Sequence, residues 1–235
     1  MLVTRAEPGA GETAARLVAL GHEAVLAPML TIEDVAAEPA VDDFAALLFT
    51  SANGVLAFAR ANRRRDLPAY CVGEATGDAA RAAGFSNVRV AGGDVGALAA
   101  FVARSRRPQN GALLHVAGAD LAGDLVGALA LTGFTAERRV FYRARAATHL
   151  PPHAETALTA DVPRLRAVLF HSARGARTFA NLVKHRIDSN RITALCLSRT
   201  VADAARVIAW RDVLAAQAPR EAALLALLDG LPEEN

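Results

Sequence analysis

The chain has 235 residues, enough for one large domain or for two domains of about 100 residues each. Hydrophobic residues make up 53% of it and charged residues 21%, as in globular proteins, and it has no run of about 18 apolar residues that would span a membrane. Because the start, MLVTRAEPG, lacks the basic and apolar regions of a secretory signal, we expect a cytoplasmic protein with no membrane partner.

The charge and the metal-binding residue types exclude two further classes of partner. The net charge is only +2 and no basic face with interleaved aromatic residues stands out, which argues against nucleic acid. Cys71 and Cys196 have no second cysteine at metal-ligand spacing, and two prolines keep His149 and His153 from sharing a helical face. We therefore predict no metal site.

Short apolar runs alternate with longer segments rich in Ala and Leu along the whole chain, which predicts strands and helices in turn. The expected strands are Met1–Thr4, Ala24–Leu26, Leu47–Thr50, Ala69–Val72, Val88–Val90, Leu113–Val116, Ala136–Phe141, Val168–Phe170, Thr193–Leu197, and Val207–Ile208 with Val213–Leu214. The expected helices are Gly11–Leu20, Asn53–Ala61, Thr76–Ala83, Val95–Ala103, Leu121–Leu131, Ala173–Val183, Val201–Val207 and Arg220–Leu228. This alternation favours parallel sheets covered by helices on both faces.

The sequence also repeats itself. The segment from Leu2 aligns with the segment from His115, and three further echoes follow in the same order: ALLFTSANGV at 46–55 with AVLFHSARGA at 167–176, CVGEATGDAAR at 71–81 with CLSRTVADAAR at 196–206, and GALAAFVA at 96–103 with AALLALLD at 222–229. Four echoes in one order indicate two copies of a unit of about 110 residues, hence two similar α/β domains with a cleft between them.

Weaker patterning at Thr31–Pro39 and Arg143–Pro163, with more Pro, Glu and Asp, makes these segments the candidate linkers. The repetition alone leaves two arrangements open. The domains are either sequential halves of the chain, or the first segment returns to pack with the last.

Small hydroxyl residues and glycines follow four of the expected strands. The phrases are TSANG at 50–54, GEATG at 73–77, HSARG at 171–175 and LSRTV at 197–201. In open parallel sheets, ligands bind beyond the carboxyl ends of the strands, where helix N-termini offer unpaired N–H groups to anions. The pattern therefore predicts a site for an anionic molecule.

Simpler explanations exist for the same residues. Ser51 and Ser172 are equally explained as N-caps of the helices that follow, and Thr76 and Thr200 as caps of theirs. No phosphate-binding loop, dinucleotide fingerprint or nucleophile elbow is present, and Glu7, Glu12 and Glu74 are best explained as surface or cap residues. Binding through hydroxyl and backbone groups is favoured over nucleophilic catalysis.

Taken together, these phrases resemble the uroporphyrinogen-III synthase family along nearly the whole chain. The resemblance is carried by VTR at 3–5, AP at 27–28, LLFTSANGV at 47–55, VGEATGDAARAAGF at 72–85, HVAG at 115–118, VFYRA at 140–144, VLFHSARGA at 168–176, LCLSRTVADAA at 195–205 and the closing AP…LLALL at 218–228. Single phrases are weak signals, but their order, spacing and duplication are specific.

The resemblance implies an α/β fold of two flavodoxin-like parallel-sheet domains, joined by a two-stranded linker with a cleft between them. Carried over to this sequence, residues 1–30 plus 150–235 form domain one and residues 38–139 form domain two. The linker strands are then 31–37 and 140–149.

The resemblance also implies a reaction. The family cyclises and dehydrates hydroxymethylbilane, a linear tetrapyrrole with eight carboxylates, inverting ring D to give uroporphyrinogen III in heme biosynthesis. No cofactor or metal takes part, and a small-molecule substrate is the only partner expected. We expect a monomer, because nothing in the sequence marks an interface. The alternative is a bilobed small-anion binding protein without catalysis.

In VFYRA, Tyr142 falls on the family's tyrosine beside the cleft, where a phenol can donate to the departing hydroxyl; the alternative is a half-buried strand tyrosine. His171 departs from the family, which more often has Thr there; it either holds a carboxylate when protonated or is simply exposed. The expected substrate contacts are Arg5, Thr50, Ser51, Ala52, Thr76, Gly118, Ser172, Ala173, Ser198 and Thr200.

Overall fold

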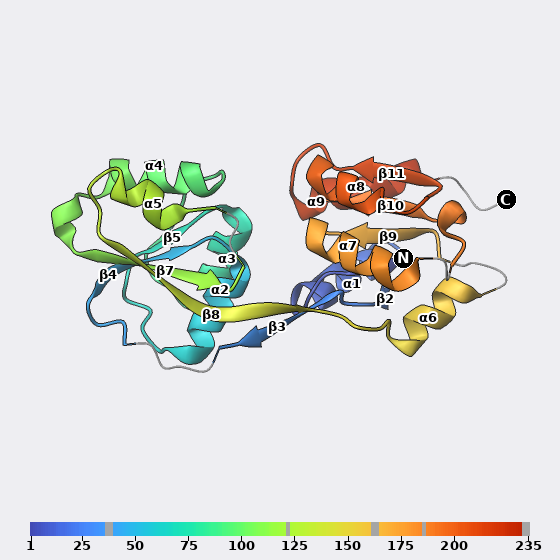
Figure 1. Ribbon diagram of the computed structural model, residues 1–235, viewed down its shortest axis with the longest axis horizontal. Coiled ribbons are helices and arrows are strands. Elements are labelled where there is room, and N and C mark those ends of the chain that lie inside the picture. Colours follow the sequence, from blue (N-terminus) through green and yellow to red (C-terminus); the bar gives the residue numbers. More distant parts are fainter. Residues whose placement is uncertain (36–39, 121–122, 161–164, 185–186, 232–235) are drawn as a thin grey trace. The chain divides into compact units, whose positions relative to one another are not determined.

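The computed structural model describes residues 1–35, 40–120, 123–160, 165–184 and 187–231 (Figure 1). The chain divides into two compact units. Unit 1 comprises Met1–Thr31 and Arg145–Asn235, and unit 2 comprises Ile32–Ala144. Residues 36–39, which fall at the end of the expected linker 31–37 and the start of the expected domain 38–139, lie outside the described residues.

Unit 1 is built on a parallel sheet. Its strand order is β11 (Asp212–Ala215), β10 (Thr193–Cys196), β9 (Ala167–Phe170), β1 (Leu2–Val3) and β2 (Val25–Leu26). Its helices are α1 (Gly9–Ala19), α6 (Pro152–Thr159), α7 (Ala173–Val183), α8 (Arg199–Ala205) and α9 (Glu221–Leu225), with 3-10 turns at Ser189–Arg191 and Ala226–Gly230. The N-terminal strand thus lies inside a sheet made mostly of C-terminal strands.

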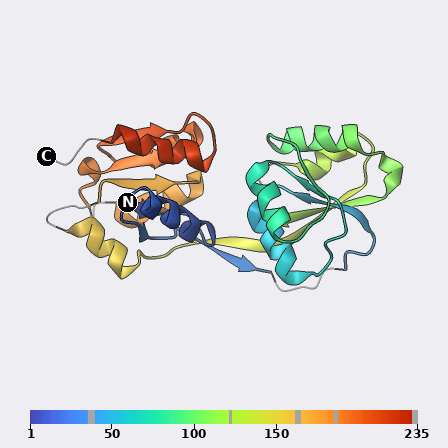
Figure 2. The same ribbon diagram turned by 180° about the vertical axis from the view of Figure 1, so that it is seen from behind.

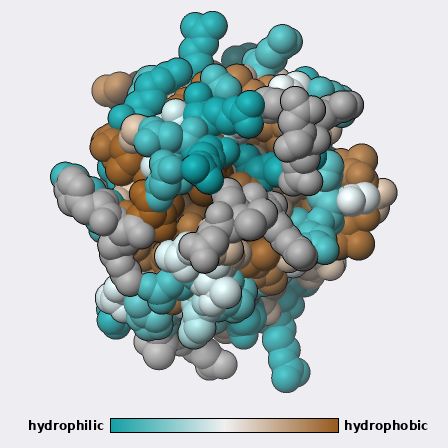
Figure 3. All heavy atoms as spheres, turned by 90° about the vertical axis from the view of Figure 1, so that its right-hand side faces the viewer, coloured by the Kyte–Doolittle hydropathy of each residue, from teal (hydrophilic) through white to brown (hydrophobic). Residues whose placement is uncertain are grey.

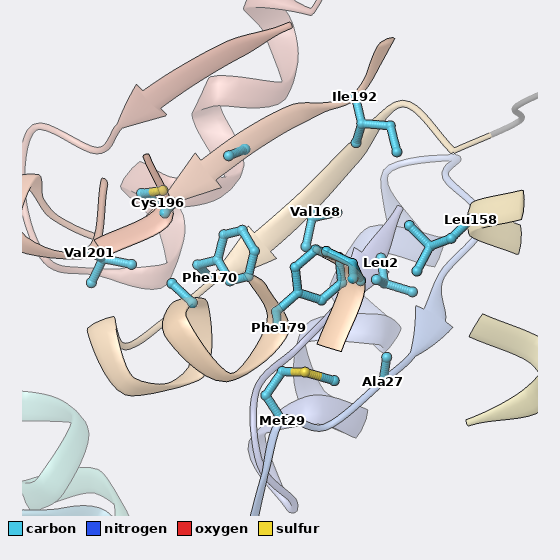
Figure 4. Close-up of a cluster of buried hydrophobic side chains, with 14 of the residues drawn as sticks. Leu2, Ala27, Met29, Leu158, Val168, Phe170, Phe179, Ile192, Cys196 and Val201 are labelled. Atoms are coloured by element: carbon cyan, nitrogen blue, oxygen red, sulfur yellow. The ribbon is translucent and has the colours of Figure 1, made fainter. Parts of the chain in front are cut away.

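Alternating side chains along the strands of unit 1 build a core on each face of the sheet. On β9, Val168 and Phe170 face α6, α7 and α8, whereas Ala167 and Leu169 face α1 and α9. Figure 4 shows the first of these cores, and Figures 1 and 2 show α7 and α1 on opposite sides of the sheet. Helices cover both faces, which is why these strands are continuously apolar.

Unit 2 carries a second sheet. Its order is β3 (Leu30–Asp34), β8 (Ala136–Ala146), β7 (Ala112–Gly118), β4 (Phe44–Phe49), β5 (Ala69–Cys71) and β6 (Val88–Val90), and the pairs from β8 to β6 are parallel. One face packs against α2 (Ala52–Ala61) and α3 (Glu74–Ala82), and the other against α4 (Val95–Ser105) and α5 (Leu125–Ala130). A 3-10 turn, Pro108–Asn110, precedes β7.

The chain passes between the units within two paired strands. The unit boundaries, Thr31/Ile32 and Ala144/Arg145, fall inside β3 and β8. These strands are hydrogen-bonded neighbours, and the Val35 amide continues their pairing by donating to the Phe141 carbonyl at 2.8 Å.

The α/β fold with parallel sheets is confirmed, and α7 has the expected bounds. The expected strand at Val207–Ile208 is wrong, because these residues belong to the turn after α8, where the Trp210 indole donates to the Ala205 carbonyl. Helix α6 was missed within the segment taken as a linker, although Pro152 at its first position is a helix-start signal. Leu121 and Ala122, the start of the expected helix Leu121–Leu131, lie outside the described residues.

On the face of the molecule that Figure 3 shows, hydrophilic and hydrophobic side chains are interspersed. Within the described ranges, no helix combines the length and the apolar character that crossing a bilayer requires.

We predict that Phe170→Ala destabilises unit 1 by about 3 to 5 kcal/mol, because it removes a fully buried ring. The Phe170 ring contacts Phe179 and Trp210, with centroids 5.4 and 5.7 Å away. The measurement is urea unfolding followed by the fluorescence of Trp210, the single tryptophan. Leu131→Ala, at an 89% exposed side chain, is the control, and a loss below about 1 kcal/mol for Phe170→Ala would contradict the described core.

Candidate active site

A cavity of about 80 Å³ lies at the carboxyl ends of β4 and β7 in unit 2. Parallel sheets place ligands at this edge. The residues that line it come from two strand ends, the start of α4, the loop before α5, and β8: Thr50, Ser51, Val95, His115, Ala117, Gly118, Asp120, Gly123 and Tyr142. The structure thus brings together four residues predicted from the sequence, namely Thr50, Ser51, Gly118 and Tyr142.

Tyr142 reaches the cavity because β8 contains a bulge. Ala117 of β7 pairs with Val140, but the next residue, Gly118, pairs with Tyr142, so Phe141 is extra. Phe141 is buried in the core beneath α2 and α3, and Tyr142 is half-buried against the same core and also lines the cavity. Bulges often aim a side chain in this way near functional sites.

Gly118 allows the phenol ring to lie against the backbone. A Cβ at Gly118 would come within 2.8 Å of Cζ and 3.0 Å of Oη of Tyr142. The Ala119 amide also donates to the Tyr142 carbonyl at 2.8 Å. The position of the phenol therefore depends on the absence of a side chain at residue 118.

The two hydroxyls after β4 have different partners. The Ser51 hydroxyl accepts from the Asn53 amide at 3.1 Å and caps α2, so the cap interpretation of Ser51 is confirmed. The Thr50 hydroxyl lies 3.2 Å from Nε2 of His115, a residue for which the sequence suggested no role. A histidine inside the apolar run ALLHVAG was the available signal.

His115 is 2% exposed. Burial, with a smaller contribution from the positive charge of Arg138, lowers the pKa of His115 from 6.5 to about 4. The imidazole is therefore neutral at neutral pH.

Thr76 lies elsewhere in unit 2. It is buried in the first turn of α3, outside the residues that line the cavity, and Gly73 occupies the N-cap position. The alternative that Thr76 caps its helix is wrong. Ala52 is the first residue of α2, directly after the Ser51 cap.

The expected contacts of unit 1 lie at the starts of its helices. The Ser172 hydroxyl accepts from the Gly175 amide at 3.0 Å and caps α7, and Ala173 follows it. Ser198 caps α8 through the Val201 amide at 3.4 Å. Thr200 is exposed within α8, so the alternative that it caps this helix is wrong.

Arg5 is held by an internal carboxylate that sequence reasoning missed. Glu221, the first residue of α9, accepts from Arg5 Nη1 at 3.3 Å and from the Thr13 hydroxyl at 2.6 Å. His171 Nε2 lies 2.9 Å from the same carboxylate, and the His171 side chain is only 9% exposed. The alternative of a simply exposed His171 is therefore wrong. Glu221 was visible only as an acidic residue near the start of an expected helix.

The part of the chain that the structure describes has neither a metal-binding cluster nor a reactive thiolate. No group of three His, Cys, Asp or Glu residues there could hold a metal ion. Cys71 and Cys196 are buried and free, and burial raises the pKa of each thiol to about 12, so neither supplies a thiolate nucleophile at neutral pH.

Parallel sheets covered on both faces, with a polar cavity beyond the strand ends, define the class of α/β proteins that bind small molecules at the carboxyl edge of a sheet. Within this class, the family model of uroporphyrinogen-III synthase HemD matches residues 11–226, and the chain belongs to the uroporphyrinogen-III synthase family. Its members are cyclising lyases of tetrapyrrole biosynthesis.

Two solved structures are similar in fold. One is the crystal structure of uroporphyrinogen-III synthetase from Helicobacter pylori, with 18% identity and a TM-score of 0.67, covering 97% of this chain and 98% of that chain. The other is a mutant uroporphyrinogen III synthase from Thermus thermophilus, with 18% identity and a TM-score of 0.54, covering 97% of this chain and 96% of that chain. A search among curated proteins finds no match.

We predict that Gly118→Ala destabilises unit 2 by about 1 to 3 kcal/mol, because the added methyl group overlaps the Tyr142 ring. Urea unfolding followed by circular dichroism measures the change. Gly73→Ala is the matched control, since nothing lies within 4 Å of its added Cβ. Equal stability of the two variants would show that the ring moves aside freely.

We predict that Glu221 makes the stability of unit 1 depend on acid pH. Burial alone would raise the pKa of Glu221, but hydrogen bonds from His171 and Thr13 and the charge of Arg5 lower it from 4.5 to about 2. Ionised Glu221 therefore contributes about 2 to 3 kcal/mol to the free energy of unfolding of unit 1. This contribution is present above pH 4.5 and is lost as the pH falls toward 2.

Urea unfolding at a series of pH values, followed by Trp210 fluorescence, tests this. Glu221→Gln should remove that part of the pH dependence, whereas Glu12→Gln, at an exposed position of α1, should keep it. A wild-type stability that is constant from pH 5 to pH 3 would contradict the prediction.

Proposed function

We propose that the cavity of unit 2 receives the hydroxymethyl end of hydroxymethylbilane and that the Tyr142 phenol donates to the departing hydroxyl. As a uroporphyrinogen-III synthase, the chain closes this linear tetrapyrrole with loss of water and inversion of ring D. The observation that carries the proposal is the phenol itself, which the β8 bulge and Gly118 hold in a polar cavity at the sheet's carboxyl edge.

The proposed reaction begins with a proton transfer. As the C–O bond breaks, its electron pair leaves with oxygen, the Tyr142 proton completes a water molecule, and an azafulvene cation forms. The substituted carbon of ring D attacks this cation to give a spiro intermediate, which fragments and recloses with ring D inverted. The proton lost when the last pyrrole regains aromaticity returns to the phenolate. Atoms and charge balance without a cofactor.

Uncatalysed closure of the tetrapyrrole gives the symmetric I isomer. In this scheme much of the catalysis therefore comes from holding the substrate in the folded conformation that leads to the III isomer. The carboxylates of the substrate suit the N-termini of α2 and α7, where the helix dipole is positive. We propose contacts of this kind at Ser51, Ala52, Ser172, Ala173 and Ser198. Arg5, Thr50, Thr76, Gly118 and Thr200 complete the proposed set.

We also propose that the two units are copies of one ancestral unit. The sheet order β11-β10-β9-β1-β2 matches β6-β5-β4-β7-β8 when strands are matched by their echoed sequences. The registers support this: Phe170 pairs with Cys196 as Phe49 pairs with Cys71, and Val3 pairs with Leu169 as His115 pairs with Leu48. The register thus matches His115 with Val3, one residue on from Leu2, with which the sequence alignment matches it.

In this proposal unit 1 is a permuted copy, since the strands matching β7 and β8 come first in the chain, as β1 and β2. The boundaries 1–30 plus 150–235 and 38–139, with linker strands 31–37 and 140–149 and a substrate cleft between the domains, belong to the same proposal. Separately, we propose that the protein is a monomer, is cytoplasmic and has no nucleic-acid partner. Binding of a small anion without catalysis is not favoured by the family membership.

We predict that Tyr142→Phe slows formation of the III isomer by about 100-fold, because it removes the proton donor. Hydroxymethylbilane is generated in situ, the products are oxidised, and the I and III isomers are separated by chromatography.

The matched control is Tyr70→Phe, at the other tyrosine of the chain. Tyr70 is fully buried and its hydroxyl accepts from Arg89 at 3.1 Å, so this change should cost some stability and leave the isomer ratio unchanged. A wild-type rate in Tyr142→Phe would remove Tyr142 from the acid role. Wild-type protein that leaves only the I isomer would refute the proposed activity.

A further inference from the structure

His115 occupies a buried position in a central strand, where apolar side chains are usual. It lies within β7, where six consecutive residues from Leu113 to Gly118 are buried, and it pairs with Leu48 of the neighbouring strand. A buried polar ring costs desolvation free energy that hydrogen bonds must offset. Packing alone therefore does not account for a histidine here.

The other unit supplies an internal comparison. At the matching register of its sheet, Val3 pairs with Leu169 and is fully buried. Valine thus satisfies the same backbone environment without any polar group. The histidine of unit 2 adds a hydrogen-bonding group that the sheet itself does not need.

The imidazole of His115 contacts the Thr50 hydroxyl. Nε2 of His115 lies 3.2 Å from Oγ1 of Thr50, and both residues line the cavity that Tyr142 also lines. The neighbouring hydroxyl, on Ser51, already accepts from the Asn53 amide. Of the two hydroxyls after β4, Thr50 is therefore the one whose orientation a histidine sets.

The ring is suited to hold a hydroxyl. A neutral imidazole has one N–H and one lone pair, so Nε2 either donates to a lone pair of the Thr50 hydroxyl and leaves its proton available, or accepts that proton and leaves its lone pairs available. Arg138, which lies opposite His115 in the β7–β8 pairing, donates to the carbonyls of Gly118 and Ala119 at 2.7 and 2.9 Å. Its fixed positive charge opposes protonation of His115.

We infer that His115 is a positioning residue for the cyclisation: it holds the Thr50 hydroxyl in the cavity, where that hydroxyl bonds a polar group of the tetrapyrrole beside Tyr142. The inference rests on the proposed function. In one tautomer Thr50 offers its proton to an oxygen of the substrate, and in the other it accepts from a pyrrole N–H. Both roles require the side chain of Thr50 to be fixed by the ring.

The test compares His115→Val, His115→Gln, Thr50→Val and the double variant His115→Val/Thr50→Val. His115→Val places in β7 the residue found at the matching register of unit 1. We expect kcat for the III isomer to fall about 10- to 100-fold in either single valine variant, with KM changed less. The double variant should be no slower than the singles, because the two residues act as one unit.

Rescue separates positioning from a structural role. His115→Gln keeps a donor and an acceptor, so it should recover most of the rate, and the melting temperature of His115→Val should stay within about 3 °C of the wild type. His149→Val, at an exposed histidine of unit 1, is the control. If His115→Val does not fold, Thr50→Val measures the same contact from its other side.

Additive losses, no recovery in His115→Gln, or wild-type rates in the valine variants would each overturn the inference. These outcomes differ from failure of the proposed function, in which the wild-type protein itself leaves only the I isomer. Wild-type III-isomer formation with an unaffected Thr50→Val variant refutes the positioning role alone.

Discussion

The parallel pairing of β1 with β9 is the constraint on which the rest of this architecture depends. Thr4, directly after β1, donates through its hydroxyl to the carbonyl of Leu169, 165 residues away. Because β1 lies between β9 and β2, the sheet of unit 1 combines N-terminal and C-terminal strands, and it is complete only when the C-terminal segment pairs with the N-terminal one. A whole second unit fits in the interval, and the two passages between units lie within the neighbouring strands β3 and β8. The loop-closure cost of such a distant pairing grows only slowly with the length of the interval, and the two-faced core of unit 1 offsets it.

The candidate site depends on a second, more local constraint, the close approach of Tyr142 to the backbone at Gly118. At the bulge both aromatic rings pack against the core beneath α2 and α3, but only Tyr142 also lines the cavity, where the glycine at residue 118 leaves room for its ring. Around it, one serine is used as a helix cap, whereas the neighbouring threonine is held by a buried histidine. The chemistry of the site thus comes from ordinary strand and helix ends, refined by a few contacts.

Much of this could be predicted from local pattern. Continuous apolar runs marked the buried strands β4, β7 and β9, and serine after an apolar run marked the caps of α2 and α7. Patterning failed at the strands and helix near the unit boundaries, where β3 and the end of β8 are partly exposed and α6 buries only Ala154 and Leu158. It also failed for Glu221, whose role is set by three partners that lie far away along the chain.

The sequence by itself determined the alternation of strands and helices, the serine caps of α2 and α7 and, through the order of its motifs, the family. These features follow from the period of apolar residues and from bonds between residues a few positions apart, so they are written locally. Only the tertiary structure decided that Tyr142 lies against the backbone at Gly118, that Thr50 contacts His115, and that Arg5 and His171 share one carboxylate. Each of these depends on how elements far apart along the chain come together in space, whereas periodicity reports only on residues within one element.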